Sequence, residues 1–252
     1  MFKIFKNKHK QESDESITNG VRLITAYQPK HTISEQLRTV RTNIEFAGAA
    51  LDELKVVMFT SPEMSDGKST VAANVAVTWA QAGKKVLLVD ADMRRPTVHL
   101  TFNSANTQGL STILAGNKLP EEVITDSFVD NLAVLTAGPV PPNPSELLGS
   151  KHMHQFVEWA RANYDIVILD ATPVLAVSDV QVSLPEVDGT VLVVRMEKTL
   201  RGNIQRTVEV LKMADAKILG VVERVKNGRG DKGYGYGYGY GYGYGYGYGS
   251  DK

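Results

Sequence analysis

The sequence predicts an α/β protein in which helices cover both faces of a parallel sheet, the doubly wound arrangement. Its apolar runs are short and continuous rather than alternating, as expected of strands that are buried on both faces. Segments with helical periodicity separate these runs, so successive strands can lie parallel. The alternating region spans about 190 residues, which suits a single domain.

Composition narrows the function before any motif is considered. The chain has 252 residues, no cysteine, and 28 basic residues against 28 acidic ones. The absence of cysteine excludes a disulfide framework, a thiolate metal site and a cysteine nucleophile. Charge balance argues against a general nucleic-acid partner. No apolar run approaches the length of a membrane span, so a soluble, cytoplasmic protein is expected.

Three regions follow from the distribution of residues. We expect residues 1–33 to form a basic, loosely ordered arm, because four lysines and no acid stand in the first ten positions. Residues 34–227 are the predicted domain. Residues 228–252 hold 11 of the 22 glycines and 8 of the 10 tyrosines, a composition that favours a disordered tail.

The domain is predicted to begin with a helix over 34–47, capped by Ser34. Its apolar residues share one face, and a charged set occupies a separate arc of the helix. The charged set is Glu35, Arg38 and Arg41. Such a face either contacts solvent or meets another subunit.

The remaining elements alternate along the chain. The predicted strands are 56–60, 86–90, 132–138, 166–170, 190–195 and 218–224. The predicted helices are 69–82, 145–164 (capped by Ser145) and 200–214.

A phosphate-binding loop lies between the first strand and the helix that follows it. Its residues are Ser65, Asp66, Gly67, Lys68, Ser69 and Thr70. Backbone N–H groups at such a loop point at phosphate oxygens, the lysine adds a charge near the β- and γ-phosphates, and the serine hydroxyl binds Mg²⁺. Pro62 replaces the first glycine of the full pattern. The loop places the fold in the P-loop NTPase type.

Acidic residues end two further strands. Asp90 and Asp92 follow the strand 86–90, and Asp170 ends the strand 166–170. The carboxyl edge of a parallel sheet is its ligand edge, so these carboxylates suit Mg²⁺ binding and activation of an attacking hydroxyl. Asp92 could instead cap a turn. Arg94 and Arg95 come next, and either could face the nucleotide or a neighbouring subunit.

With these motifs the chain resembles the bacterial tyrosine kinases, in particular the cytoplasmic half of the split type that regulates capsule and exopolysaccharide synthesis. The resemblance rests on the phosphate loop, VLLVDADMRRP, the stretch GPVPPNPSELL (138–148), Asp170 and the tyrosine-rich end. It covers residues 35–248, nearly the whole chain. Glu35, Arg38 and Arg41 match the E-x-x-R-x-x-R oligomerisation motif of that family.

The resemblance implies an ATP- and Mg²⁺-dependent autokinase. Lys68 would hold phosphates, Ser69, Asp92 and Asp170 would surround Mg²⁺, and Asp90 would take the tyrosine proton. A ring homo-oligomer would bring the tail of one subunit to the site of the next. The cytoplasmic tail of a membrane-bound polysaccharide co-polymerase would activate the kinase and recruit it to the inner face of the membrane.

The chain departs from the family pattern at three places. Met64 and Ser65 stand where Pro-Gly is usual in the loop. Arg224 stands where an asparagine usually helps to hold adenine. The tail is a strict Gly-Tyr repeat.

The repeat supplies the predicted phosphoacceptors, which are Tyr234, Tyr236, Tyr238, Tyr240, Tyr242, Tyr244, Tyr246 and Tyr248. Twenty residues extend to at most about 65–70 Å, so the tail can reach a neighbouring subunit. Each phosphate adds about −1.5 to −2 charges, so the fully phosphorylated tails are expected to repel one another and cause the oligomer to dissociate.

Two other functions compete with the autokinase. A ParA/MinD-like ATPase switch shares the fold, but that class carries a second lysine where this chain has Glu63. A self-association scaffold would use the Gly-Tyr repeat, but it would leave the nucleotide motifs unexplained.

Overall fold

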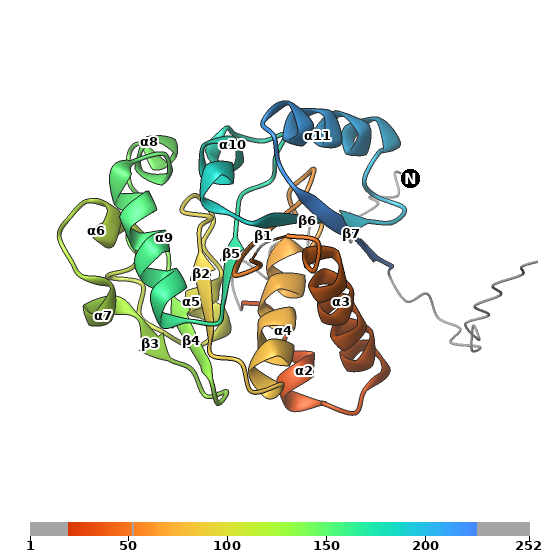
Figure 1. Ribbon diagram of the computed structural model, residues 1–252, viewed down its shortest axis with the longest axis horizontal. Helices are drawn as coiled ribbons and strands as arrows, with labels where there is room; N and C mark the ends of the chain where they lie inside the picture. The colour runs from red at the N-terminus through yellow and green to blue at the C-terminus, as the bar shows by residue number, and fades with distance from the viewer. Residues whose placement is uncertain (1–19, 52, 226–252) are drawn as a thin grey trace, which may run out of the picture.

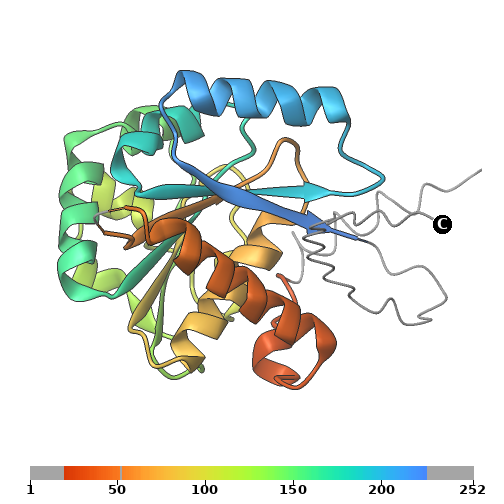
Figure 2. The same ribbon diagram turned by 45° about the vertical axis from the view of Figure 1, so that its right-hand side comes forward.

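The computed structural model describes residues 20–51 and 53–225, and these residues form a seven-stranded sheet covered by helices on both faces (Figures 1 and 2). The strand order is β3-β4-β2-β5-β1-β6-β7, and all neighbours pair parallel except β3 with β4. The strands are β1 (Val56–Thr60), β2 (Val86–Asp90), β3 (Thr125–Asp126), β4 (Leu132–Leu135), β5 (Ile166–Asp170), β6 (Gly189–Arg195) and β7 (Ile218–Arg224). The predicted doubly wound α/β fold is confirmed.

Two sets of helices sandwich the sheet. On one face lie α2 (Ile24–Tyr27), α3 (Thr32–Gly48), α4 (Lys68–Gln81) and α5 (Val98–Thr101). On the other lie α6 (Leu110–Leu114), α7 (Pro120–Val123), α8 (Pro144–Leu148), α9 (Lys151–Asn163), α10 (Asp179–Ser183), the 3₁₀ turn η1 (Leu184–Glu186) and α11 (Arg201–Met213). Helix α4 packs against the middle of the sheet, and its residues 71–80 are all buried.

The strands follow from their apolar sequences. Every residue of β1, β2, β4 and β5 is buried, as the continuous apolar runs predict for strands with helices on both faces. Strand β7 is at the sheet edge and is only partly buried. Strand β4 ends at Leu135, three residues before the predicted end at 138. The short edge strand β3 was not predicted, because two exposed polar residues carry no strand pattern.

The helix predicted over 34–47 is present in the structure as α3, and it begins two residues earlier than predicted. Helix α3 begins at Thr32, and the cap is His31, whose Nδ1 accepts a hydrogen bond from the backbone N–H of Ile33 at 3.1 Å. Ser34 is fully buried, and its hydroxyl donates to the backbone oxygen of Gln28 at 2.7 Å. The prediction that Ser34 caps this helix is therefore wrong, because its hydroxyl instead ties α3 to the turn before it.

The predicted helix over 145–164 is two helices. Helix α8 ends at Leu148, and α9 begins after Ser150, whose hydroxyl caps it by accepting from the N–H of Met153 at 3.4 Å. Gly149 separates the two, as expected of a residue with low helix propensity. Ser145 lies inside α8 and is not the cap of a long helix.

Part of the expected N-terminal arm packs on the domain. From residue 20 the chain lies against α4 and α5: Leu23 is 2% exposed, and the backbone N–H and hydroxyl of Thr25 donate to oxygens of Asn74 at 2.9–3.2 Å. The apolar and threonine side chains that anchor this stretch lack a sustained period, which is why the sequence suggested a loose arm. The basic start and the Gly-Tyr tail lie outside the described residues.

In the part of the chain that the structure describes, no helix combines the length and apolar character that a membrane crossing needs.

Candidate active site

The phosphate loop connects β1 to α4 at the carboxyl edge of the sheet. A pocket opens there, and the loop lines it with Ser65, Gly67, Lys68, Ser69 and Thr70. Across the pocket lie Asp92, Arg94 and Arg95 from the segment after β2, and Thr172 and Pro173 from the segment after β5. The structure thus brings the predicted loop and the predicted acidic segments around one cavity.

The loop holds a tight shape through two left-handed residues and a buried carboxylate. Gly67 has a φ of +99°, and Ser65 has a φ of +65°, which is rare for a residue with a side chain. Asp66 is fully buried: one carboxylate oxygen accepts from the N–H of Glu63 at 3.1 Å, and the other pairs with Lys198 at 3.2 Å. The Asp66 side chain therefore shapes the loop and does not line the pocket.

Lys198 is a contributor that the sequence did not reveal. It lies between β6 and α11, and besides Asp66 its ammonium group contacts the backbone oxygen of Met64. Next to it, Asn203 at the start of α11 hydrogen-bonds Glu63. These contacts fasten the phosphate loop to a segment more than a hundred residues away, a separation at which no local pattern could predict them.

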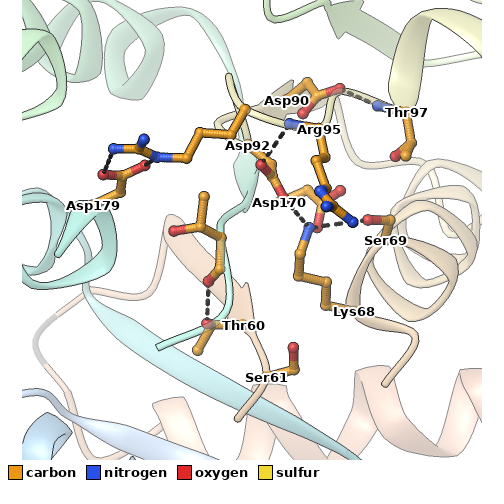
Figure 3. A network of polar contacts seen from close by, with 12 residues as sticks. Thr60, Ser61, Lys68, Ser69, Asp90, Asp92, Arg95, Thr97, Asp170 and Asp179 are labelled. Carbon is orange, nitrogen blue, oxygen red and sulfur yellow. Dashed lines mark hydrogen bonds and ion pairs between the residues drawn. The ribbon is translucent and has the colours of Figure 1, made fainter. Parts of the chain in front are cut away.

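A buried cluster of one lysine and three carboxylates lies below the loop (Figure 3). Strand pairing sets it up, because Asp90 of β2 is the register partner of Asp170 of β5. Lys68 Nζ lies 2.9 Å from Asp92 Oδ2, 3.2 Å from Asp170 Oδ1 and 3.2 Å from Ser69 Oγ. The cluster brings together residues predicted from three separate motifs.

Burial and charge perturb these groups strongly. Burial alone would lower the pKa of Lys68, but the negative charges of Asp170 and Asp92 outweigh it and raise that pKa. Burial, with the charge of Asp170, raises the pKa of Asp90 to about 8. Burial also raises the pKa of Asp170, although Lys68 lies beside it. Such perturbed groups beside a pocket are typical of catalytic sites.

The two acids after β2 are oriented differently. Asp92 lines the pocket, and its Oδ1 accepts from the backbone N–H of Arg95 at 3.0 Å. Asp90 is fully buried, and its Oδ2 accepts from the N–H groups of Thr97 and Val98 at 2.8 and 2.9 Å. Asp90 Oδ1 and Asp170 Oδ2 are buried without a hydrogen-bond partner among the described residues.

The sequence could not distinguish the roles of the adjacent Arg94 and Arg95, and the structure shows that an acidic side chain holds Arg94. Arg94 forms a bidentate pair with Asp179 of α10 at 2.8 and 3.0 Å, and Ser145 of α8 also donates to Asp179. Burial would raise the pKa of Asp179, but the hydrogen bonds from Arg94 and Ser145 outweigh it and lower that pKa. This network fastens the segment after β2 to the stretch that contains GPVPPNPSELL. Asp179 had no sequence signal.

Arg224, the last residue of β7, reaches the back of the phosphate loop. Its Nη1 donates to the backbone oxygen of Asp66 at 3.4 Å, and a Cβ at Gly67 would come within 1.8 Å of the same nitrogen. The residue that departs from the family's asparagine therefore contacts the loop that is predicted to hold phosphate.

The predicted oligomerisation residues on α3 are largely bonded within the chain. Arg38 pairs with Glu35 at 2.5 Å and donates to the backbone oxygen of Pro29. Arg41 donates to the backbone oxygen of Thr78 at 2.8 Å and has a side chain that is 19% exposed. Glu35 is the most exposed of the three.

Comparison with known proteins identifies the family. Residues 55–219 match the family model described as an AAA domain. The Bacillus subtilis tyrosine-protein kinase YwqD is 47% identical over 200 residues, which cover 79% of this chain and 84% of that protein.

Solved structures agree with this result. The kinase domain of the Escherichia coli tyrosine kinase ETK is 36% identical, with a TM-score of 0.78 over 86% of this chain and 85% of that one. The chimerical protein CapA2B2 is 38% identical, with a TM-score of 0.77 over 84% of this chain and 97% of that one. The P-loop NTPase fold that the sequence predicts is confirmed. On this evidence the chain belongs to the family of bacterial tyrosine-protein kinases.

Proposed function

We propose that this kinase transfers the γ-phosphoryl group of ATP to the tyrosines of its own Gly-Tyr tail, in trans between subunits of a ring. One observation carries the proposal. Strand β7 runs parallel to β6, ends against the phosphate loop through Arg224, and leads directly into the tyrosine-rich segment. The tail is therefore tethered at the edge of the sheet that carries the nucleotide pocket.

The residues at the pocket fit Mg·ATP. Among the described residues no three histidine or acidic side chains form a metal site by themselves. The available donors are the Ser69 hydroxyl and the oxygens of Asp92 and Asp170, including the unpartnered Asp170 Oδ2. Mg²⁺ is usually held by one or two carboxylates together with substrate phosphates and water, so this hard-oxygen set suits it. When bound, the ion would neutralise charge on the β- and γ-phosphates.

Lys68 is the proposed phosphate ligand. It now bridges Asp92 and Asp170, and phosphate oxygens would replace these carboxylates as its partners. The backbone N–H groups of residues 65–70 would surround the phosphates, aided by the amino end of α4.

The incoming tyrosine must lose its proton as the phosphoryl group arrives. Asp90 is our proposed base, because its Oδ1 has no partner among the described residues while its Oδ2 is fixed by two N–H groups. Asp92 lies nearer the pocket surface and is the proposed metal ligand. Substituting each by asparagine separates the roles: loss of metal-dependent nucleotide binding is expected for Asp92→Asn and not for Asp90→Asn.

The assembly proposed is a ring homo-oligomer in which α3 contributes Glu35, Arg38 and Arg41 to the contact between subunits. The Glu35 side chain is 64% exposed and that of Arg38 is 29% exposed. The cytoplasmic tail of a membrane-bound polysaccharide co-polymerase is the proposed activator, which would bring the kinase to the inner face of the membrane. A chimerical protein among the structural neighbours supports such a two-component arrangement.

Phosphate mapping tests the function. The full chain is incubated with Mg·ATP and the activator's cytoplasmic segment, and phosphate is located by mass spectrometry beside a Lys68→Met control. Phosphate on residues 234–248 of the wild type alone is expected. Its absence from these tyrosines would contradict the autokinase, and its persistence in Lys68→Met would contradict the site. Mixing Lys68→Met with a wild-type chain truncated after residue 227 then tests transfer in trans.

A further inference from the structure

Arg95 is a cationic side chain at the nucleotide pocket to which no role has been given so far. It lines the pocket with Lys68, Ser69 and Thr70 of the phosphate loop. In Figure 3 its side chain extends from the segment after β2 toward the side of the site where Lys68 and Ser69 lie. Arg95 is exposed, so its guanidinium is accessible to a ligand that enters the pocket.

The other cations around the pocket are already paired. Lys68 pairs with two carboxylates, Arg94 pairs with Asp179, and Lys198 pairs with Asp66. Within residues 20–51 and 53–225, by contrast, the Arg95 guanidinium forms no hydrogen bond or ion pair. Arg95 therefore places a positive charge at a predicted phosphate site, and among the described residues this charge stabilises no other side chain.

The backbone of Arg95 is fixed although its side chain is free. Its N–H donates to Asp92 Oδ1 at 3.0 Å and to the backbone oxygen of Asp92 at 3.2 Å. Pro96 follows and restricts the chain further. The guanidinium is thus attached at a constant place beside Asp92, which we propose as a metal ligand, and only its own rotamers remain to be set by a ligand.

We propose that Arg95 is a further catalytic residue, whose guanidinium contacts the γ-phosphoryl oxygens of ATP during transfer. In that step the bond between the γ-phosphorus and the β–γ bridging oxygen breaks, and a bond from the tyrosine oxygen forms. The tyrosine proton passes to the base, and ADP leaves with the bridging electron pair. Charge spreads over the three γ-oxygens in the transition state, where a planar guanidinium can donate to two of them.

The inference rests on the proposed phosphoryl transfer and explains a feature of the loop. Nucleotide switches with a second lysine in the loop have two cations there, whereas this chain has Glu63, which accepts a hydrogen bond from Asn203 and is not among the residues that line the pocket. Arg95 would supply the second cation from the opposite wall of the pocket.

Binding of a transition-state analogue tests Arg95 without requiring turnover. Full-length wild type, Arg95→Gln, Arg95→Lys and the matched control Arg206→Gln, which alters an exposed arginine of α11, are titrated with Mg·ADP and with Mg·ADP plus fluoroaluminate. We expect Arg95→Gln to bind Mg·ADP within about threefold of wild type and to lose at least about tenfold in affinity for the fluoroaluminate complex. Arg95→Lys should recover part of the loss, and Arg206→Gln should match wild type.

Rates give the second measurement. We expect Arg95→Gln to lower the rate of tail phosphorylation on the order of 10²-fold at saturating ATP, below the full range of arginine fingers because the side chain is exposed. Equal affinity of wild type and Arg95→Gln for the fluoroaluminate complex, or an equal loss for ADP, would overturn the inference. A wild type that binds the analogue but leaves the tail unphosphorylated would instead contradict the proposed autokinase.

Discussion

Removing the Lys68 ammonium should destabilise the fold as well as abolish catalysis. Its nitrogen lies 2.9 Å from Asp92 and 3.2 Å from Asp170, and the three side chains are 11%, 6% and 1% exposed. Deleting one partner of a buried ion pair leaves an uncompensated charge and costs about 3–5 kcal/mol. For a domain of this size that corresponds to a melting temperature lower by roughly 10 °C.

The loss of stability in Lys68→Met should depend on pH, and the carboxyl groups of Asp90 and Asp170 determine the direction. Burial raises the pKa values of Asp90 and Asp170 in the folded state, so the fold binds their protons more tightly than the unfolded chain does. The contribution of these two carboxyls to the free energy of unfolding is present at low pH. It is lost as the pH rises through their pKa values in the folded state. Without Lys68 these carboxyls take up protons more readily, so the deficit of Lys68→Met should be larger at pH 8 than at pH 6.

Urea unfolding without nucleotide measures this effect. Lys118→Met is the control, since Lys118 forms only an exposed pair with Glu122 and should change the unfolding free energy by less than about 1 kcal/mol. Asp170→Asn in the Lys68→Met background should recover part of the stability. A Lys68→Met protein within about 1 kcal/mol of wild type at pH 8 would refute the view that Lys68 compensates buried charge.

Three further predictions concern the phosphate loop and Asp188, which bonds the backbone at the start of β1. Ser65→Gly should raise the unfolding free energy by up to about 1 kcal/mol in thermal melts, because the left-handed φ of +65° strains serine, and a lower melting temperature would contradict this. Gly67→Ala should weaken Mg·ATP binding in calorimetry by more than about tenfold, since a Cβ adds left-handed strain and meets Arg224, and unchanged affinity would refute the loop assignment. Arg161, paired at 2.6 Å, and two backbone N–H groups offset burial and lower the pKa of Asp188, so its stabilisation is present near neutral pH and lost as acid protonates it. Asp188→Asn should therefore cost about 2 kcal/mol at pH 7 in urea unfolding, and this cost should shrink progressively as the pH falls below about 4; a deficit constant with pH would contradict the cause.

Much of the framework could be predicted because it is encoded locally. The bounds of β1, β2, β5 and β7 agree with the predicted ones, since each is an apolar run interrupted by turn residues. The loop and the acids at strand ends could be located because parallel strands bring their carboxyl ends to one edge.

What could not be predicted depends on distant partners. The pairs Lys198–Asp66 and Arg94–Asp179 join segments 132 and 85 residues apart, and neither has a sequence pattern of its own. Helices of four or five residues, such as α5 and α6, are too short to show a period. The packing of residues 20–33 on α4 depends on the side chain of Asn74, whose hydrogen bonds only the folded chain reveals.

The long-range contacts of β1 and the phosphate loop also determine when, during synthesis of the chain, the nucleotide pocket can form. The N–H of Val56, where the strand before the phosphate loop begins, is bonded by Asp188, 132 residues later. At about 5–20 residues per second, a ribosome needs on the order of 7–26 s to cover that interval, and Lys198 follows shortly after. The contacts of β1 and the phosphate loop are therefore complete only after residue 198 has been synthesised, and the Gly-Tyr segment follows later in the chain. The proposed acceptor tyrosines are therefore synthesised soon after the last residues that fasten the phosphate loop, so the site and its proposed substrate become available within seconds of each other.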